Sequence, residues 1–369
     1  MNVPQFIPYI DYAEYDAIKE CFDDLWITEG PKSKQFAKEL CDIIGSKYGV
    51  FAPNGTLSLY LGLRALGIGP GDEVIVPDFT FIASANAIEM TGATPIFVDV
   101  GFDCQINIRG RDDLITPKTK AIMPVHMYGM SADMDQVTEF AKQHGLLIIE
   151  DAAQAFGVKW RSKGCGNWGH VGSFSFFADK TITTGEGGFV TTDDDDIYAQ
   201  LQYLRNQGRL HRGTFEHPYI GYNFRITDIH AAVGLAQLRK FPTIASNKQK
   251  TYDRYRLKLN KNIAIVAPQS QHSTYIPFRV TVMTPMKAPE VIKQFTTYGI
   301  EGRSFFYPLH RQKCYQYIAN DARHQDTEFP VSNKLYEHGV CLPSFASISD
   351  EQIDYVCDGL NRIIENGNS

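Results

Sequence analysis

The sequence predicts an α/β fold: a large domain with a mostly parallel central sheet flanked by helices, and a smaller C-terminal α/β domain. Its 369 residues are too many for one small core. Between about residues 33 and 235, strand-like apolar runs alternate with helical patterns, as in the strand at 73–78, the helix at 83–90 and the strand at 94–100. This alternation is typical of βαβ units, which form parallel sheets covered by helices.

The next unit repeats the pattern. A strand is predicted at 121–126, a helix at 134–144 that ends at Gly145, and a strand at 146–150. The chain then becomes rich in glycine, and two strands are expected, at 173–177 and 188–192, around a loop between them. Loops on a rigid sheet are where functional residues tend to lie.

A helix near 227–238 is followed by Phe241-Pro242, which we interpret as a domain boundary. The predicted large domain covers residues 1–238, and its first 25 or so residues could instead pack on the small domain, which covers 239–369. The small domain is expected to mix strands and helices, at 278–282, 289–298, 302–306 and 350–364.

Composition and charge argue against several classes of protein. The formal net charge is −6 and no dense run of Lys or Arg occurs, so nucleic-acid binding is not expected. The seven cysteines lack C-x-x-C spacing and the histidines form no ligand set, so neither disulfides nor a metal site is expected. No 18-residue apolar run and no signal peptide are found, which predicts a cytoplasmic protein without membrane contact.

Two charged residues are candidates for chemistry. Asp151 follows a buried strand, at the edge where open α/β sheets bind ligands, and it could pair with a protonated ring nitrogen; the alternative is a helix N-cap. Lys180 follows the apolar run S-F-S-F-F-A-D and precedes a glycine turn, where burial would make its amine nucleophilic. The alternative for Lys180 is an ordinary surface lysine.

Other segments suit parts of a cofactor. Gly55 and Thr56 follow Asn54 at the start of a helical pattern, where free N–H groups could bind a phosphate; the alternative is simple capping. Phe81, just past a strand end, could stack on a flat ring or pack in the core. The glycines at 67–71 precede a strand instead of following one, so a nicotinamide-dependent dehydrogenase is not supported.

Taken together, several segments of the chain resemble, in order, the DegT family of fold-type-I sugar aminotransferases. They are N-G-T at 54, P-D-F-T-F at 77, E-D-A-A-Q at 150, S-F-S-F-F-A-D-K at 173, T-T-G-E-G-G at 183 and G-Y-N-F-R-I-T-D at 221. Some relatives carry a histidine at the lysine position and act as dehydratases. Because this chain has Lys180 there, the resemblance implies transamination.

The resemblance implies pyridoxal 5'-phosphate as the cofactor, bound by Lys180 as a Schiff base and converted to pyridoxamine 5'-phosphate during turnover. It implies that Asp151 holds the pyridinium nitrogen of the cofactor, that Gln154 lies near the phenolic oxygen, and that Phe81 stacks on the ring. It assigns the phosphate to Gly55, Thr56 and Ser175. Asn223 and Arg225 would reach the site of a second subunit, which implies a homodimer with shared active sites.

The implied reaction moves an amino group from L-glutamate to a keto-sugar nucleotide. The segments at 299–310 and 341–345 resemble members that aminate C4 of GDP-4-keto-6-deoxymannose, for O-antigen or related surface polysaccharides. Arg303, Tyr307 and His310 would then lie near the sugar or its diphosphate, or else pack the small lobe on the large one. The alternatives are a UDP- or dTDP-linked keto-sugar, aminated at C3 or C4, and a non-catalytic regulatory or binding protein.

Overall fold

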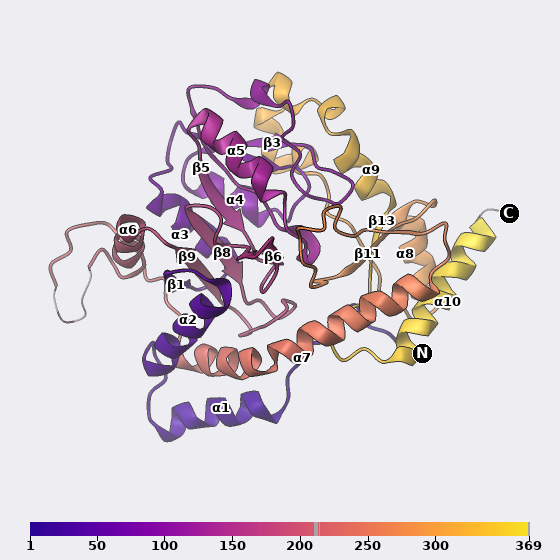
Figure 1. The fold of residues 1–369 in the computed structure, drawn as a ribbon, viewed down its shortest axis with the longest axis horizontal. Helices are drawn as coiled ribbons and strands as arrows, with labels where there is room; N and C mark the ends of the chain where they lie inside the picture. Colours follow the sequence, from indigo (N-terminus) through magenta and orange to yellow (C-terminus); the bar gives the residue numbers. More distant parts are fainter. Residues whose placement is uncertain (210–212, 214, 368–369) are drawn as a thin grey trace.

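A seven-stranded sheet forms the centre of the large lobe (Figure 1). The computed structural model describes residues 1–209, 213 and 215–367. The strand order is β1-β9-β8-β5-β4-β2-β3, and all neighbours are parallel except that β9 runs antiparallel to β8 and β1. The strands are β1 Tyr48–Ala52, β2 Glu73–Pro77, β3 Thr94–Val98, β4 Thr119–Ile122, β5 Leu147–Asp151, β8 Val171–Ser175 and β9 Gly188–Thr192. A short hairpin adds β6 Lys159–Trp160 and β7 Lys163–Gly164.

Helices cover both faces of this sheet because successive side chains of each strand point to opposite faces. In β2, Val74 and Val76 pack into a cluster with α3 and α4, whereas Ile75 packs into a cluster with α5. The helices of this lobe are α1 Tyr12–Asp23, α2 Pro31–Ile44, α3 Gly55–Ala65, α4 Ala83–Met90, α5 Met134–His144 and α6 Asp195–Arg205, with short 3-10 turns η1 Asp112–Leu114 and η2 Met127–Gly129. The expected α/β fold with a mostly parallel sheet is thus confirmed.

The second lobe contains a four-stranded antiparallel sheet, in the order β10-β11-β13-β12. Helices α8 and α10 pack on it, and Val280, Phe295, Val340 and Leu360 share its core. The elements are β10 Ala264–Ile265, β11 Val280–Met283, α8 Ala288–Thr297, β12 Arg303–Ser304, α9 Pro330–His338, β13 Gly339–Leu342 and α10 Asp350–Gly367. The strands and helices expected here exist, with ends shifted by a few residues.

The helix predicted at 227–238 is longer than expected. Helix α7 runs from Asp228 to Lys258 with Pro242 inside it, so a helix end at the proline was a wrong prediction. Leu235, before the proline, packs in the large lobe, and Tyr255, after it, packs in the small one. Packing at both ends outweighs the one backbone hydrogen bond that a proline removes. The domain division proposed at residue 238 falls inside this helix (Figure 1).

Two segments connect the lobes out of sequence order. Near the N-terminus, Val3 pairs with Ile300 of the small lobe, whereas α1 packs along α7. After β12, the chain returns to the large lobe, where Leu309 and Phe329 join its core. This returning segment is made of short 3-10 turns, η3 Leu309–Arg311, η4 Lys313–Ile318, η5 Ala322–His324 and η6 Asp326–Glu328.

The described part of the chain was searched for membrane-spanning helices, metal sites and disulfides. None of its helices is long and apolar enough to cross a membrane. Within the same residues, no group of three or more His, Cys, Asp or Glu side chains could hold a metal ion. All seven cysteines are free thiols.

Candidate active site

The carboxyl ends of β5 and β8 bring the first site residues together. These strands are parallel neighbours, and Asp151 at the end of β5 pairs with Ser173 of β8, two residues before Ser175. Parallel strands end at a common edge, so Asp151 and Ser175 belong to the same edge of the sheet. The loop that follows β8 carries Lys180.

Asp151 is held as a fixed, nearly buried carboxylate, 6% exposed. One oxygen accepts a hydrogen bond from Ser84 Oγ at 2.8 Å, and the other accepts one from the Ala153 backbone N–H at 3.1 Å. The element that follows β5 is the strand β6 and not an α-helix, so Asp151 is not the helix N-cap that was the alternative. Ser84 was missed from the sequence because it lies 67 residues away, although its segment also follows a strand end.

Lys180 is not an ordinary surface lysine. Its side chain is half-buried, and Nζ lies 4.8 Å from the centroid of the Phe278 ring, which comes from the small lobe. Burial lowers the pKa of Lys180, the nearby Arg279 cation lowers it further, and the carboxylates of Asp179 and Asp151 oppose this shift. A lysine with a lowered pKa has more of the neutral amine that acts as a nucleophile or base.

The start of α3 forms a cradle beside Ser175. Asn54 caps the helix by accepting from the Leu57 N–H at 3.0 Å, and Gly55 and Thr56 are the first helical residues. A Cβ on Gly55 would lie 2.7 Å from Ser175 Cβ and 3.0 Å from its Oγ, so only glycine lets these segments approach so closely. Helix N-termini with a nearby hydroxyl suit a phosphate group, and this cradle therefore fits the phosphate of pyridoxal phosphate.

Gln154 and Phe81 have geometry that suits the ring of the same cofactor. Gln154 accepts the Tyr128 N–H at 3.0 Å through Oε1, which leaves its NH₂ group as the end that can donate to a ligand. Phe81 is 56% exposed, although a large aromatic ring is usually buried, and its ring centroid lies 6.1 Å from that of Phe306. Phe306 also stacks on Tyr128, with ring centroids 5.9 Å apart and an angle of 8° between the ring planes. We call Phe81, Phe306 and Tyr128 the aromatic wall. No pattern in the sequence marks Phe306 beyond its place beside Tyr307.

Asn223 and Arg225 occupy a different part of the large lobe. Asn223 is exposed and pairs with Asn206, and Arg225 Nη1 donates to Asn206 Oδ1 at 3.0 Å. Two large apolar side chains of this region, Phe215 and Ile220, are 89% and 87% exposed.

The three predicted substrate residues have unlike surroundings. Arg303 is exposed on β12, and Tyr307 is 41% exposed with its ring edge-on to Tyr336 at 5.0 Å. His310 is 8% exposed, and both of its ring nitrogens contact carboxylates of Asp78 and Asp326. His310 therefore packs its segment on the large lobe, and these surroundings favour a packing role over a contact with substrate.

Comparisons with known proteins agree with this geometry. The chain is 39% identical over 363 residues to GDP-perosamine synthase of Escherichia coli O157:H7, with 98% of each chain covered. It is 35% identical over 356 residues to a UDP-N-acetyl-3-dehydro-α-D-glucosamine 3-aminotransferase of Acidithiobacillus ferrooxidans, covering 94% of this chain and 92% of the relative.

Among solved structures, the putative sugar aminotransferase Spr1654 of Streptococcus pneumoniae matches in its PMP form with a TM-score of 0.92 and 28% identity, covering 99% of this chain and 98% of that one. The same protein in its PLP form has a TM-score of 0.91. These neighbours confirm the expected cofactor. The DegT/DnrJ/EryC1/StrS aminotransferase family model matches residues 8–361, and the chain therefore belongs to that family.

Proposed function

We propose that this enzyme transfers the amino group of L-glutamate to GDP-4-keto-6-deoxymannose, giving GDP-perosamine. The observation that carries the proposal is the placement of a lysine of lowered pKa, a buried carboxylate and a glycine-lined helix start at one edge of the sheet. A regulatory protein with this fold would not need the Lys180 amine, so the presence of all three groups supports catalysis.

Each group has a role that follows from its chemistry. Pyridoxal phosphate, when bound, supplies an electron sink for the carbon that loses a proton. Asp151 would hold the ring nitrogen in its protonated form, because its carboxylate is fixed by Ser84 and the Ala153 N–H. Gly55, Thr56 and Ser175 would bind the phosphate and so orient the ring against Phe81.

Lys180 would carry the proton. Its neutral Nζ would remove a proton from the glutamate α-carbon and pass it to the cofactor in the first half-reaction, and in the second it would move a proton from the cofactor to the sugar carbon. A lowered pKa suits both steps, because the same nitrogen must accept and release a proton near neutral pH.

The GDP-sugar is favoured over other nucleotides by the relative at 39% identity, and a UDP-linked 3-keto sugar is the second candidate because of the relative at 35%. Arg303 and Tyr307, which are exposed beside the aromatic wall, are the residues we assign to the sugar nucleotide. A cytoplasmic location and a place in surface-polysaccharide synthesis stay predictions.

We also propose a homodimer in which Asn223 and Arg225 reach the partner's active site. The exposed Asn223 and the exposed Phe215 and Ile220 support it, since large apolar side chains on a surface are candidates for an interface. Sedimentation of the wild type and of the Phe215→Ser/Ile220→Ser variant tests this proposal. A monomeric wild type would contradict it.

The function is tested by following the two half-reactions in the absorbance of the purified, cofactor-loaded protein. We expect glutamate to remove the yellow colour and GDP-4-keto-6-deoxymannose to restore it. Lys180→Ala should bind the cofactor without the borohydride-sensitive bond and lose turnover, whereas Lys120→Ala, at an exposed lysine on β4, should behave as the wild type.

The outcomes separate the parts of the proposal. If glutamate bleaches the protein and only a UDP- or dTDP-linked keto-sugar restores it, the aminotransferase stands and the GDP substrate is wrong. If Lys180→Ala keeps substantial transaminase activity, the assignment of Lys180 is wrong.

A further inference from the structure

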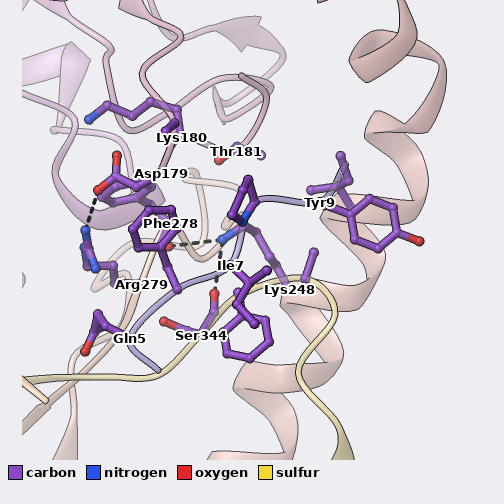
Figure 2. Close-up of a pocket in the computed structure, with 16 residues that line it drawn as sticks. Gln5, Ile7, Tyr9, Asp179, Lys180, Thr181, Lys248, Phe278, Arg279 and Ser344 are labelled. Carbon is purple, nitrogen blue, oxygen red and sulfur yellow. Dashed lines mark hydrogen bonds and ion pairs between the residues drawn. The ribbon is translucent and has the colours of Figure 1, made fainter. Parts of the chain in front are cut away.

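Asp179, the residue before Lys180, forms an ion pair with a residue of the small lobe. Its Oδ2 accepts a hydrogen bond from Arg279 Nη2 at 2.6 Å, and the two side chains are only 12% and 9% exposed (Figure 2). Arg279 directly precedes β11, so the contact joins residues 100 positions apart. An ion pair with so little exposure is screened much less by salt than a surface pair.

The second oxygen of Asp179 is buried and has no hydrogen-bond partner among the described residues. An ionised, buried carboxylate oxygen without a donor is costly, so this oxygen needs one. Figure 2 shows it on the side of Asp179 that faces the Lys180 amine, opposite the dashed contact to Arg279. Among the charged groups near Lys180, the Asp179 carboxylate also has the largest effect on the pKa of the lysine, ahead of that of Asp151.

The other cations near Asp179 are already engaged. Arg279 donates to Oδ2. Lys248, which reaches the same pocket from α7, donates from Nζ to the backbone carbonyls of Phe278 and Ser344, both at 3.2 Å. Lys180 Nζ is therefore the donor best placed to approach Oδ1, since a change in its side-chain rotamer moves the amine without moving the backbone.

We propose that Asp179, held by Arg279, is a positioning residue for Lys180. Whenever Nζ of Lys180 is not bonded to the cofactor, the protonated amine donates a hydrogen bond to the Asp179 carboxylate. The proposal rests on the function proposed above and deepens it. The proton stays on Nζ, and only its hydrogen-bond partner changes. The carboxylate keeps the released lysine close to the reacting carbon and stabilises its charged form.

Asp179 and Arg279 shift the pKa of Lys180 in opposite directions. Asp179 raises the pKa of Lys180 and Arg279 lowers it, while Asp151 also raises it and burial lowers it. Lys248, whose own pKa burial lowers to about 8, borders the same pair. Removing the Asp179 charge should therefore lower the pKa of Lys180, and removing the Arg279 charge should raise it. A pair that only joined the lobes, without acting on the Lys180 charge, would leave this pKa unchanged in both variants.

The test measures the pKa of Lys180 in the full-length protein after removal of the cofactor, by competitive labelling with acetic anhydride across a pH series and quantification of the Lys180 peptide. We expect Asp179→Asn to move the midpoint down by about one pH unit and Arg279→Gln to move it up. Arg279→Lys should restore most of the wild-type value. Asp196→Asn, which removes an exposed charge on α6, is the matched control and should leave it unchanged.

A second readout comes from the loaded enzyme. The pH profile of kcat should shift in the same directions as the labelling midpoints, with KM for both substrates close to the wild-type values. If both variants shift the midpoint the same way, or if neither shifts it, the proposal is overturned. If Asp179→Asn does not fold, the Arg279→Gln and Arg279→Lys variants still test the proposal. An unshifted midpoint in Arg279→Gln is enough to overturn the proposal.

Labelling is done without substrate, so the two proposals can fail separately. Opposite shifts in a protein that does not transaminate would refute the proposed function and keep the lysine–aspartate contact. A transaminase whose Lys180 midpoint is unmoved by both variants would refute the contact and keep the function.

Discussion

Asp78 and His310 form a buried double contact between the large lobe and the returning segment. Asp78, directly after β2, accepts the His310 backbone N–H at 2.7 Å through Oδ1, and its Oδ2 lies 2.9 Å from His310 Nδ1. The other ring nitrogen, Nε2, lies 2.9 Å from Asp326 Oδ1. With a carboxylate at each nitrogen, both can donate only if the ring is protonated.

This contact predicts a loss of stability at alkaline pH. Burial opposes the charged ring, but the carboxylates of Asp78 and Asp326 outweigh burial and raise the pKa of His310. A group whose folded pKa is raised stabilises the protein fully below its unfolded pKa, about 6.5, and loses that contribution as pH rises through the folded pKa. The free energy of unfolding in urea should fall between about pH 6 and the folded pKa. The fall should be roughly 1.4 kcal/mol for each pH unit that separates the folded pKa of His310 from its unfolded pKa.

The variant His310→Gln isolates this effect. It should be less stable than the wild type at about pH 6 and should lack the alkaline decrease, because the titrating ring is gone. Burial raises the pKa of Asp78, and the hydrogen bond and charge of His310 oppose this shift. A wild-type stability that does not change over the window would contradict a charged His310.

Gly55→Ala should weaken cofactor binding. The added Cβ would lie 2.7 Å from Ser175 Cβ, so helix α3 and strand β8 must move apart, and the phosphate cradle opens. We expect at least a tenfold rise in the dissociation constant of pyridoxal phosphate, which corresponds to about 1.4 kcal/mol. The affinity is measured by fluorescence titration of the cofactor-free protein.

The matched control is Gly69→Ala. A Cβ there would lie 3.3 Å from the end of the flexible Arg64 side chain and 4.0 Å from the Thr91 carbonyl oxygen, which is an ordinary contact, so cofactor affinity should stay at the wild-type value. Equal affinities for the two variants would show that the close approach of Gly55 and Ser175 does not shape the phosphate site.

Glu150→Gln should destabilise the sheet beneath the site. The Glu150 carboxylate is fully buried and accepts hydrogen bonds from the backbone N–H groups of Gly166, Trp168 and Gly169. Its Oε2 also lies 2.8 Å from His126 Nε2, while His126 Nδ1 accepts the Ala132 N–H, so the ring is the neutral Nε2–H form and donates to Glu150. An amide in this place would direct N–H groups at other donors.

We expect Glu150→Gln to lose about 2–4 kcal/mol of the free energy of unfolding, because two buried donors lose their acceptor whichever oxygen the NH₂ group replaces. Asp42→Asn is the control: it removes an exposed carboxylate that pairs with Lys38 on the surface of α2, and the change should stay within about 0.5 kcal/mol. Urea unfolding of both variants checks the prediction. A Glu150→Gln protein as stable as Asp42→Asn would contradict it.

Local sequence patterns were enough to predict the strands and helices of the large lobe. The contacts that hold the site residues in place join distant segments, and local patterns could not predict them. The helix expected at 134–144 is present with those bounds, because Asp133 caps its start and Gly145 ends it in the left-handed conformation at φ 65°. Asp151 and Lys180 were found because a strand end and a glycine turn mark them locally. By contrast, the contacts of Ser84 with Asp151 and of Arg279 with Asp179 join residues 67 and 100 positions apart, and no local pattern reports them.

The proline in α7 gives the last prediction. Pro242 is exposed in the middle of a 31-residue helix, where it supplies no N–H and costs about 3 kcal/mol relative to alanine in a regular helix. Pro242→Ala should therefore raise the free energy of unfolding by about 1–3 kcal/mol. Pro289 lies in the first turn of α8, where its missing N–H would be unpaired anyway, so Pro289→Ala is the control and should change stability by less than about 0.5 kcal/mol. A Pro242→Ala protein no more stable than this control would contradict the prediction that the proline weakens α7.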